Sequence, residues 1–84
     1  MIGYHVTTPA KLRRYEATGG ILPPVRFWAF PASAQQWSAR TGRDVILRID
    51  VDETRAHPLP DHQPRGHAWW TPQIVRAWVK EDST

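Results

Sequence analysis

A period-2 alternation between a wholly apolar and a mixed face marks Asp44–Val51 as the clearest β-strand of the sequence. One face of this strand is wholly apolar and consists of Val45, Leu47, Ile49 and Val51. The other face is mixed and carries Ile46, Arg48 and Asp50. Such alternation in β-branched residues is typical of a strand that packs one face against a core. We therefore expect the rest of the chain to be arranged around Asp44–Val51.

Two strand–helix units are predicted ahead of this strand. In the first, Ile2–Val6 forms a short strand, and the Thr-Pro pair at positions 8 and 9 begins a helix that covers Lys11–Ala17. The two glycines at 19 and 20 end that helix, because glycine adopts the left-handed backbone of a helix terminus. In the second, Val25–Phe30 forms a strand and Ala32–Thr41 a helix, which Gly42 ends.

The chain after Asp44–Val51 is expected to return to the same sheet. Asp52–Pro64 is rich in proline and polar residues, so it is predicted to be an ordered loop across the sheet. Gly66–Trp70 is predicted to be a short strand. Residues 72–80 fit either a helix, which the Thr-Pro pair at 71 and 72 would begin, or a turn followed by a closing strand over Ala77–Lys80. The sequence leaves these two alternatives open.

This pattern predicts an α+β protein with a small, strongly twisted, mixed or antiparallel sheet of about four to six strands and two or three short helices. The 84 residues are expected to form a single domain, 1–84. The sequence has no cysteine, which fits a reducing compartment, and no apolar run approaches the length of a membrane span. We therefore expect a cytoplasmic protein without membrane contact.

The net charge of +3 is unevenly distributed. Residues 44–84 carry five bases and seven acids, whereas residues 1–43 carry one acid, Glu16, and six bases: Lys11, Arg13, Arg14, Arg26, Arg40 and Arg43. A basic half favours an anionic partner such as a nucleic acid or a phosphorylated ligand. The alternative is an arginine-rich surface in contact with water alone, which charge by itself favours.

Several motifs in a fixed order resemble the ADP-ribosyltransferase-like fold, and in particular the NAD-binding lobe of the RNA 2′-phosphotransferase family. They are Tyr4-His5-Val6-Thr7-Thr8, Gly20-Ile21-Leu22-Pro23, Val25-Arg26-Phe27-Trp28, residues 42–51, and Gly66-His67-Ala68-Trp69-Trp70-Thr71-Pro72. The sequence departs from the family where Val6 replaces a glycine and where Trp28 and Phe30 replace two histidines. It also has no counterpart of the separate N-terminal lobe, so removal of RNA 2′-phosphates is not the expected activity.

The resemblance implies that NAD is the cofactor. It places His5 and Thr7 at the ribose and the nicotinamide of NAD, next to Tyr4, and it places Arg26 at a phosphate. Imidazole and guanidinium groups suit these contacts chemically. Tyr15 and Trp28 would stack on a flat ring. The catalytic residues would then be His5 and Arg26, and the acceptor of ADP-ribose a nucleic acid, a protein side chain or water.

Each of these residues also has a structural alternative. His5 would be a strand residue bonded to backbone, Thr7 or Thr8 would cap the helix, and the aromatic rings would pack in the core. Five basic residues would either contact the phosphates of a nucleic acid or lie on a surface in contact with water alone: Lys11, Arg13, Arg14, Arg40 and Arg43. His57, His62 and His67 are spaced five apart, which matches no metal-binding motif, so no metal site is predicted.

Three functions remain in competition at this point. The leading hypothesis is an NAD-binding ADP-ribosyltransferase-like enzyme with His5 and Arg26 in one cleft. The second is a non-catalytic module of the same fold that binds nucleic acid or a protein partner through a basic, aromatic surface. The third is a structural partner that dimerises through Trp69, Trp70 or Trp78.

Overall fold

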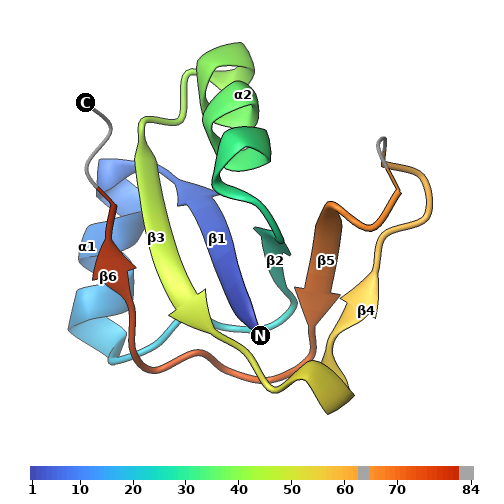
Figure 1. Cartoon of the computed structure of the whole chain (residues 1–84). Helices are drawn as coiled ribbons and strands as arrows, with labels where there is room; N and C mark the ends of the chain where they lie inside the picture. Colours follow the sequence, from blue (N-terminus) through green and yellow to red (C-terminus); the bar gives the residue numbers. More distant parts are fainter. Residues whose placement is uncertain (63–64, 82–84) are drawn as a thin grey trace.

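The computed structural model describes residues 1–62 and 65–81 and contains a six-stranded antiparallel sheet (Figure 1). Its strand order is β4-β5-β2-β1-β3-β6. The strands are β1 (Ile2–Thr7), β2 (Val25–Trp28), β3 (Val45–Asp50), β4 (His57–Pro58), β5 (Ala68–Thr71) and β6 (Val79–Lys80). Two α-helices, α1 (Pro9–Thr18) and α2 (Pro31–Thr41), and one 3₁₀ turn, Glu53–Arg55, complete the fold. The predicted α+β class with a small antiparallel sheet is confirmed.

Local sequence signals determine where both helices begin and end. The hydroxyl of Thr8 accepts a hydrogen bond from the backbone N–H of Lys11 at the start of α1. Gly19 and Gly42 end α1 and α2 with φ of 77° and 72°, in the left-handed region that glycine adopts without steric cost. The two helices therefore lie within one or two residues of their predicted positions.

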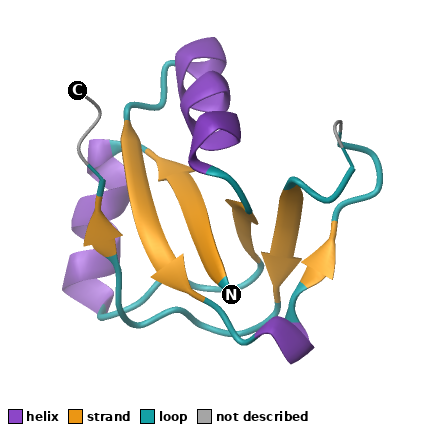
Figure 2. Ribbon diagram, viewed as in Figure 1, coloured by secondary structure: helices purple, strands orange, loops and turns teal. Residues whose placement is uncertain are grey.

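The two helices cover opposite faces of the sheet (Figure 2). On the α1 side, Leu12 and Tyr15 pack against the larger buried cluster: Ile21, Val25, Phe27, Val45, Leu47, Ile49, Val51 and Val75. On the α2 side, Ala34 and Trp37 belong to a smaller cluster with Tyr4, Val6, Trp28 and Ile46. Neighbouring residues of one strand thus lie in different clusters, as strand alternation requires.

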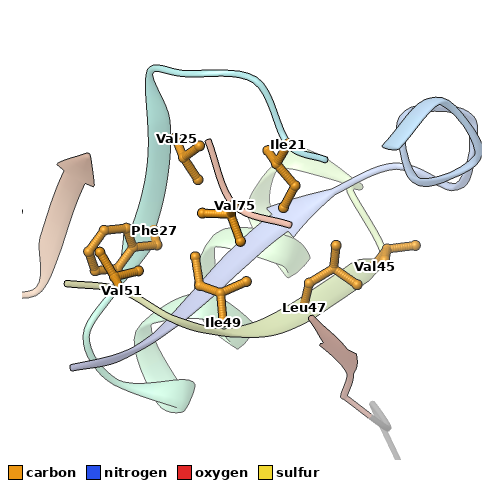
Figure 3. Packing of buried hydrophobic residues seen from close by; sticks show 8 residues of the cluster. All are labelled: Ile21, Val25, Phe27, Val45, Leu47, Ile49, Val51 and Val75. Atoms are coloured by element: carbon orange, nitrogen blue, oxygen red, sulfur yellow. The ribbon is translucent and has the colours of Figure 1, made fainter. Parts of the chain in front are cut away.

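The alternating strand supplies half of the larger cluster (Figure 3). Its four predicted core residues, Val45, Leu47, Ile49 and Val51, are all buried. β3 is nevertheless not the centre of the sheet: it lies between β1 and the two-residue strand β6. β3 lies inside the sheet, because it pairs with β1 along six consecutive residues and with β6 on its other side. Its alternation fixes which residues of the β1–β3 pair face each side of the sheet.

After β3, one prediction is wrong and one open alternative is decided. Asp52–Pro64 is not only a loop, because it contains the 3₁₀ turn and β4, while residues 63 and 64 lie outside the described part. No helix forms over the described part of residues 72–80; the closing-strand alternative is correct, although β6 is limited to Val79–Lys80. The Thr71 hydroxyl accepts from the N–H of Gln73 and so closes a turn rather than a helix.

Two strand ends also differ from prediction. β2 ends at Trp28 rather than at Phe30, because the chain bends at Ala29 before α2. β5 covers Ala68–Thr71 rather than Gly66–Trp70, since its partners on β2 are Val25–Trp28. Such shifts arise from strand pairing across the sheet, which local sequence does not encode.

Gly3 is a position where the sheet has no room for a side chain. A Cβ atom at Gly3 would lie 2.9 Å from Cγ and Cε2 of the buried Phe27 ring. We expect Gly3→Ala to lower the free energy of unfolding by about 1–3 kcal/mol through overpacking, as measured by urea denaturation. The loss should be smaller in a Phe27→Leu background, where the ring is absent. An equal loss in both backgrounds would contradict this explanation.

Candidate functional site

The candidate site lies where β1 and β2 separate. The two strands pair only at Tyr4 and Trp28, although β1 stays paired to β3 along its whole length. Past this point, the imidazole of His5 reaches across to β2, and its Nδ1 lies 2.6 Å from the backbone oxygen of Arg26. A side chain therefore links β1 to β2 beyond their backbone pair.

The direction of the hydrogen bonds at His5 follows from chemistry. A carbonyl oxygen only accepts, so Nδ1 of His5 carries the proton that it donates to Arg26. In neutral His5 the Nε2 atom then accepts from the Tyr15 hydroxyl, 3.1 Å away. The hydroxyl proton of Tyr15 is then engaged with His5. The Thr7 hydroxyl, whose oxygen lies 3.2 Å from the Tyr15 hydroxyl oxygen, therefore donates to Tyr15. Tyr15 is thereby fixed over the cleft by two residues of β1.

The surroundings of His5 keep its imidazole neutral. Burial lowers the pKa of His5 below its ordinary value of 6.5, and the nearby positive charges of Lys11 and Arg43 lower it further. The hydrogen bond to Arg26 acts in the opposite direction but is outweighed. At neutral pH, the His5 Nε2 atom is therefore a hydrogen-bond acceptor.

The lowered pKa of His5 predicts a loss of stability in acid. Below pH 6.5 the unfolded chain binds a proton at His5 that the folded chain does not, so the free energy of unfolding falls as the pH drops from 7 to 5. Urea denaturation at both pH values should show a smaller fall for His5→Gln than for the unmodified chain. His57→Gln, at an exposed position, serves as control. An undiminished fall in His5→Gln would contradict the assignment.

A cleft with a volume of about 360 Å³ opens beside His5, within the range of small-molecule sites. It is bounded by β1, β2, α1, α2 and the segments that flank β2 and β5. Its lining residues are His5, Val6, Lys11, Tyr15, Ile21, Leu22, Pro24, Arg26, Phe27, Trp28, Trp37, Arg43, Leu59, His62 and Ala68.

The cleft is positively charged. Lys11, Arg26 and Arg43 come from three separate segments, and no carboxylate of the described residues lines the cleft. The ion pairs found within residues 1–62 and 65–81 involve other groups: the N-terminus with Asp50, Arg48 with Glu81, and Arg55 with Asp52. The three cations are therefore available to an anionic ligand.

Aromatic rings form one wall of the cleft. The rings of Trp28 and Trp37 lie 5.8 Å apart, and His62 stands edge-on to Trp28 at 6.1 Å. Tyr15 contributes a further ring beside His5, at 5.7 Å. Nδ1 of His62 is buried without a hydrogen-bond partner in the described structure. The wall thus offers flat faces to a ligand.

The structure brings together some of the predicted site residues and not others. His5, Tyr15, Arg26 and Trp28 line the cleft. Thr7 is buried beneath Tyr15, and it reaches the site only through that hydroxyl. Tyr4 does not line the cleft: it packs in the α2-side cluster, at the one position where β1 is still paired to β2.

The predicted basic set is divided. Lys11 and Arg43 line the cleft, whereas Arg13 and Arg14 are exposed on α1 and Arg40 is exposed on α2. Two lining residues, Trp37 and His62, were not predicted as site residues. The helical spacing of Trp37 indicated only a buried face, and His62 belongs to a segment that had no secondary-structure signal.

The remaining histidines and tryptophans do not line the cleft. His57 stacks on Trp70 at 4.9 Å, and Nδ1 of His67 is 2.8 Å from the Ser33 hydroxyl. Within the described ranges, no three histidine, cysteine or acidic side chains form a group that could hold a metal ion. Trp69, Trp70 and Trp78 are half-buried, and Trp69 and Trp78 pack against the larger core cluster.

Comparisons with known proteins give no assignment: no family model, no curated protein and no solved structure matches this chain. In the part of the chain that the structure describes, no helix is long and apolar enough to cross a membrane.

Proposed function

We propose that this chain is an NAD-binding domain of the ADP-ribosyltransferase-like type, and that NAD binds in the cleft beside His5. The observation that carries the proposal is the combination, in one cleft, of an aromatic wall with three cations that form no ion pair within residues 1–62 and 65–81. A dinucleotide has the matching chemistry, since two phosphates lie between two flat rings.

The cleft suggests how each part of NAD would be held. Arg26 and Arg43 would bind the pyrophosphate, which carries two negative charges, with Lys11 contributing a third positive charge. One of the flat rings would lie against the Trp28–Trp37 wall. The polar groups of His5 and Tyr15 would then contact a ribose hydroxyl or the carboxamide.

The reaction proposed for this site is transfer of ADP-ribose. The bond between nicotinamide and ribose breaks, nicotinamide leaves with the bonding electrons, and an acceptor oxygen or nitrogen forms the new bond to ribose while losing a proton. The cleft would contribute mainly orientation of NAD and charge compensation by Arg26. The alternative is a module of the same fold that binds its ligands without turnover.

The proposal is tested by titrating the ¹⁵N-labelled chain with NAD and following its amide resonances. We expect saturable shifts confined to residues 4–8, 25–28 and the loop before β3. No shifts at millimolar NAD would overturn the proposal. In the same samples, mass spectrometry of released nicotinamide separates the two alternatives: release above the protein-free rate indicates an enzyme, and binding without release indicates a module.

A further inference from the structure

A row of three side chains crosses the sheet from the edge of the cleft to β4, on the face that carries α2. The strand register places Arg26 of β2 opposite Trp70 of β5, and Trp70 opposite His57 of β4. Directly opposed residues of antiparallel strands point to the same face. That face is the α2 side, because Trp28, two residues from Arg26, packs in the α2-side cluster. We call Arg26, Trp70 and His57 the open row.

The open row continues the cleft. The neighbouring row, one strand repeat away at roughly 7 Å, consists of Trp28, Ala68 and Leu59, and all three line the cleft. Leu59 belongs to this row because its N–H donates to the backbone oxygen of Ala68. Arg26 connects the cleft to the open row, since it lines the cleft and is the first residue of the open row. A ligand longer than the cleft would therefore pass onto the open row.

The open row is accessible. α2 packs against β1, β2 and β3, and Figure 1 shows β4 and β5 to one side of it. Arg26 and His57 are exposed and Trp70 is half-buried. β4 is the last strand of the sheet, so a ligand on the row can run past its edge.

The chemistry of the open row suits a nucleobase with its phosphate. The rings of His57 and Trp70 lie 4.9 Å apart with an interplanar angle of 35°, close to a parallel stack that a further flat ring can extend. The guanidinium of Arg26 lies on the cleft side of this stack. The three strands that carry the row, β2, β4 and β5, contain no acidic residue.

We propose that the open row is a stacking platform for single-stranded nucleic acid, which enters from the edge strand β4 and leads into the cleft. A single strand is required because base faces are hidden in a duplex. The net charge of +3 and the three cations of the cleft complement its phosphates. That the bound strand is the acceptor of ADP-ribose rests on the proposed function; the platform itself does not.

The test is a titration of the ¹⁵N-labelled chain with eight-residue oligothymidine and oligouridine, without NAD, at 50 and 200 mM salt. We expect shifts at residues 57 and 69–71, and affinity at least ten-fold lower at the higher salt for about three neutralised phosphates. Trp70→Ala should weaken binding about ten-fold or more, whereas Trp70→Phe, which keeps a flat ring, should stay within about three-fold. Phe30→Ala removes an exposed ring away from the row and should change nothing.

Two results would overturn the platform. One is oligonucleotide binding that Trp70→Ala and His57→Ala leave unchanged, or no binding at all at 50 mM salt. The other is a weaker affinity of Trp70→Ala for NAD but not for nicotinamide mononucleotide, because the row would then hold the adenine of NAD. If Trp70→Ala loses its dispersed amide spectrum, His57→Ala at the sheet edge carries the test. NAD shifts at residues 4–8 are scored separately, so either proposal can fail alone.

Discussion

Leu47→Ala is expected to lower the free energy of unfolding by about 2–5 kcal/mol, as measured by urea denaturation. Leu47 is 0% exposed and lies within the larger core cluster (Figure 3), so its removal leaves a cavity as well as losing apolar burial. A chain of 84 residues has a total stability on the order of 4–13 kcal/mol. At the lower end of this range, a loss of this size would leave a sizeable fraction of the variant unfolded.

Leu22→Ala is the matched control for this substitution. It removes the same atoms, but Leu22 is 67% exposed, so its effect should stay within about 0.5 kcal/mol. Similar losses for the two variants would mean that β3 does not anchor the core. The cooperative slope of the urea transition should remain the same, since neither residue changes the surface that unfolding exposes by much.

The parts of the fold with local signals were predictable from sequence. Thr8 and Gly19 define α1 because a hydroxyl cap and a left-handed glycine act within one turn of the helix. The alternation in Asp44–Val51 identified a buried strand face, since every second residue must point the same way. These signals hold irrespective of what the rest of the chain does.

The parts set by distant pairing were not predictable. β4 and β6 have two residues each, too few for a period to show, and they exist because β5 and β3 offer them backbone partners. The Thr-Pro pair at 71 and 72 resembles a helix start, yet the chain continues extended because Val75 exchanges two backbone hydrogen bonds with Ile21. Tertiary pairing here outweighs a local helix signal.

The cleft was accessible to sequence reasoning only in part. The resemblance brought His5, Tyr15, Arg26 and Trp28 together, and the structure places all four at one cleft. Tyr4 does not line the cleft, because β1 and β2 still pair at Tyr4 and separate only beyond it, which the local sequence does not encode. His62 could not be predicted, since its position depends on the path of a long connection between β4 and β5.

The double variant Arg26→Ala/Arg43→Ala is expected to weaken NAD binding about 100-fold or more. Each side chain offers a charge-assisted hydrogen bond to a phosphate, worth about 1.5–3 kcal/mol, and both line the same cleft. Partial exposure to solvent reduces these values, so the lower limit for the pair, about 3 kcal/mol or 100-fold, is the firm expectation. Isothermal titration calorimetry with NAD, at fixed ionic strength, measures the change.

The double variant Arg13→Ala/Arg14→Ala removes the same charge from the exposed face of α1, away from the cleft lining. Its NAD affinity should stay within about three-fold of the unmodified chain, because charges on the exposed surface are screened by salt. Equal losses in the two double variants would mean that NAD responds to net charge rather than to the cleft. Since Arg26 also starts the open row, the loss of NAD affinity in Arg43→Ala alone shows whether the pyrophosphate lies inside the cleft.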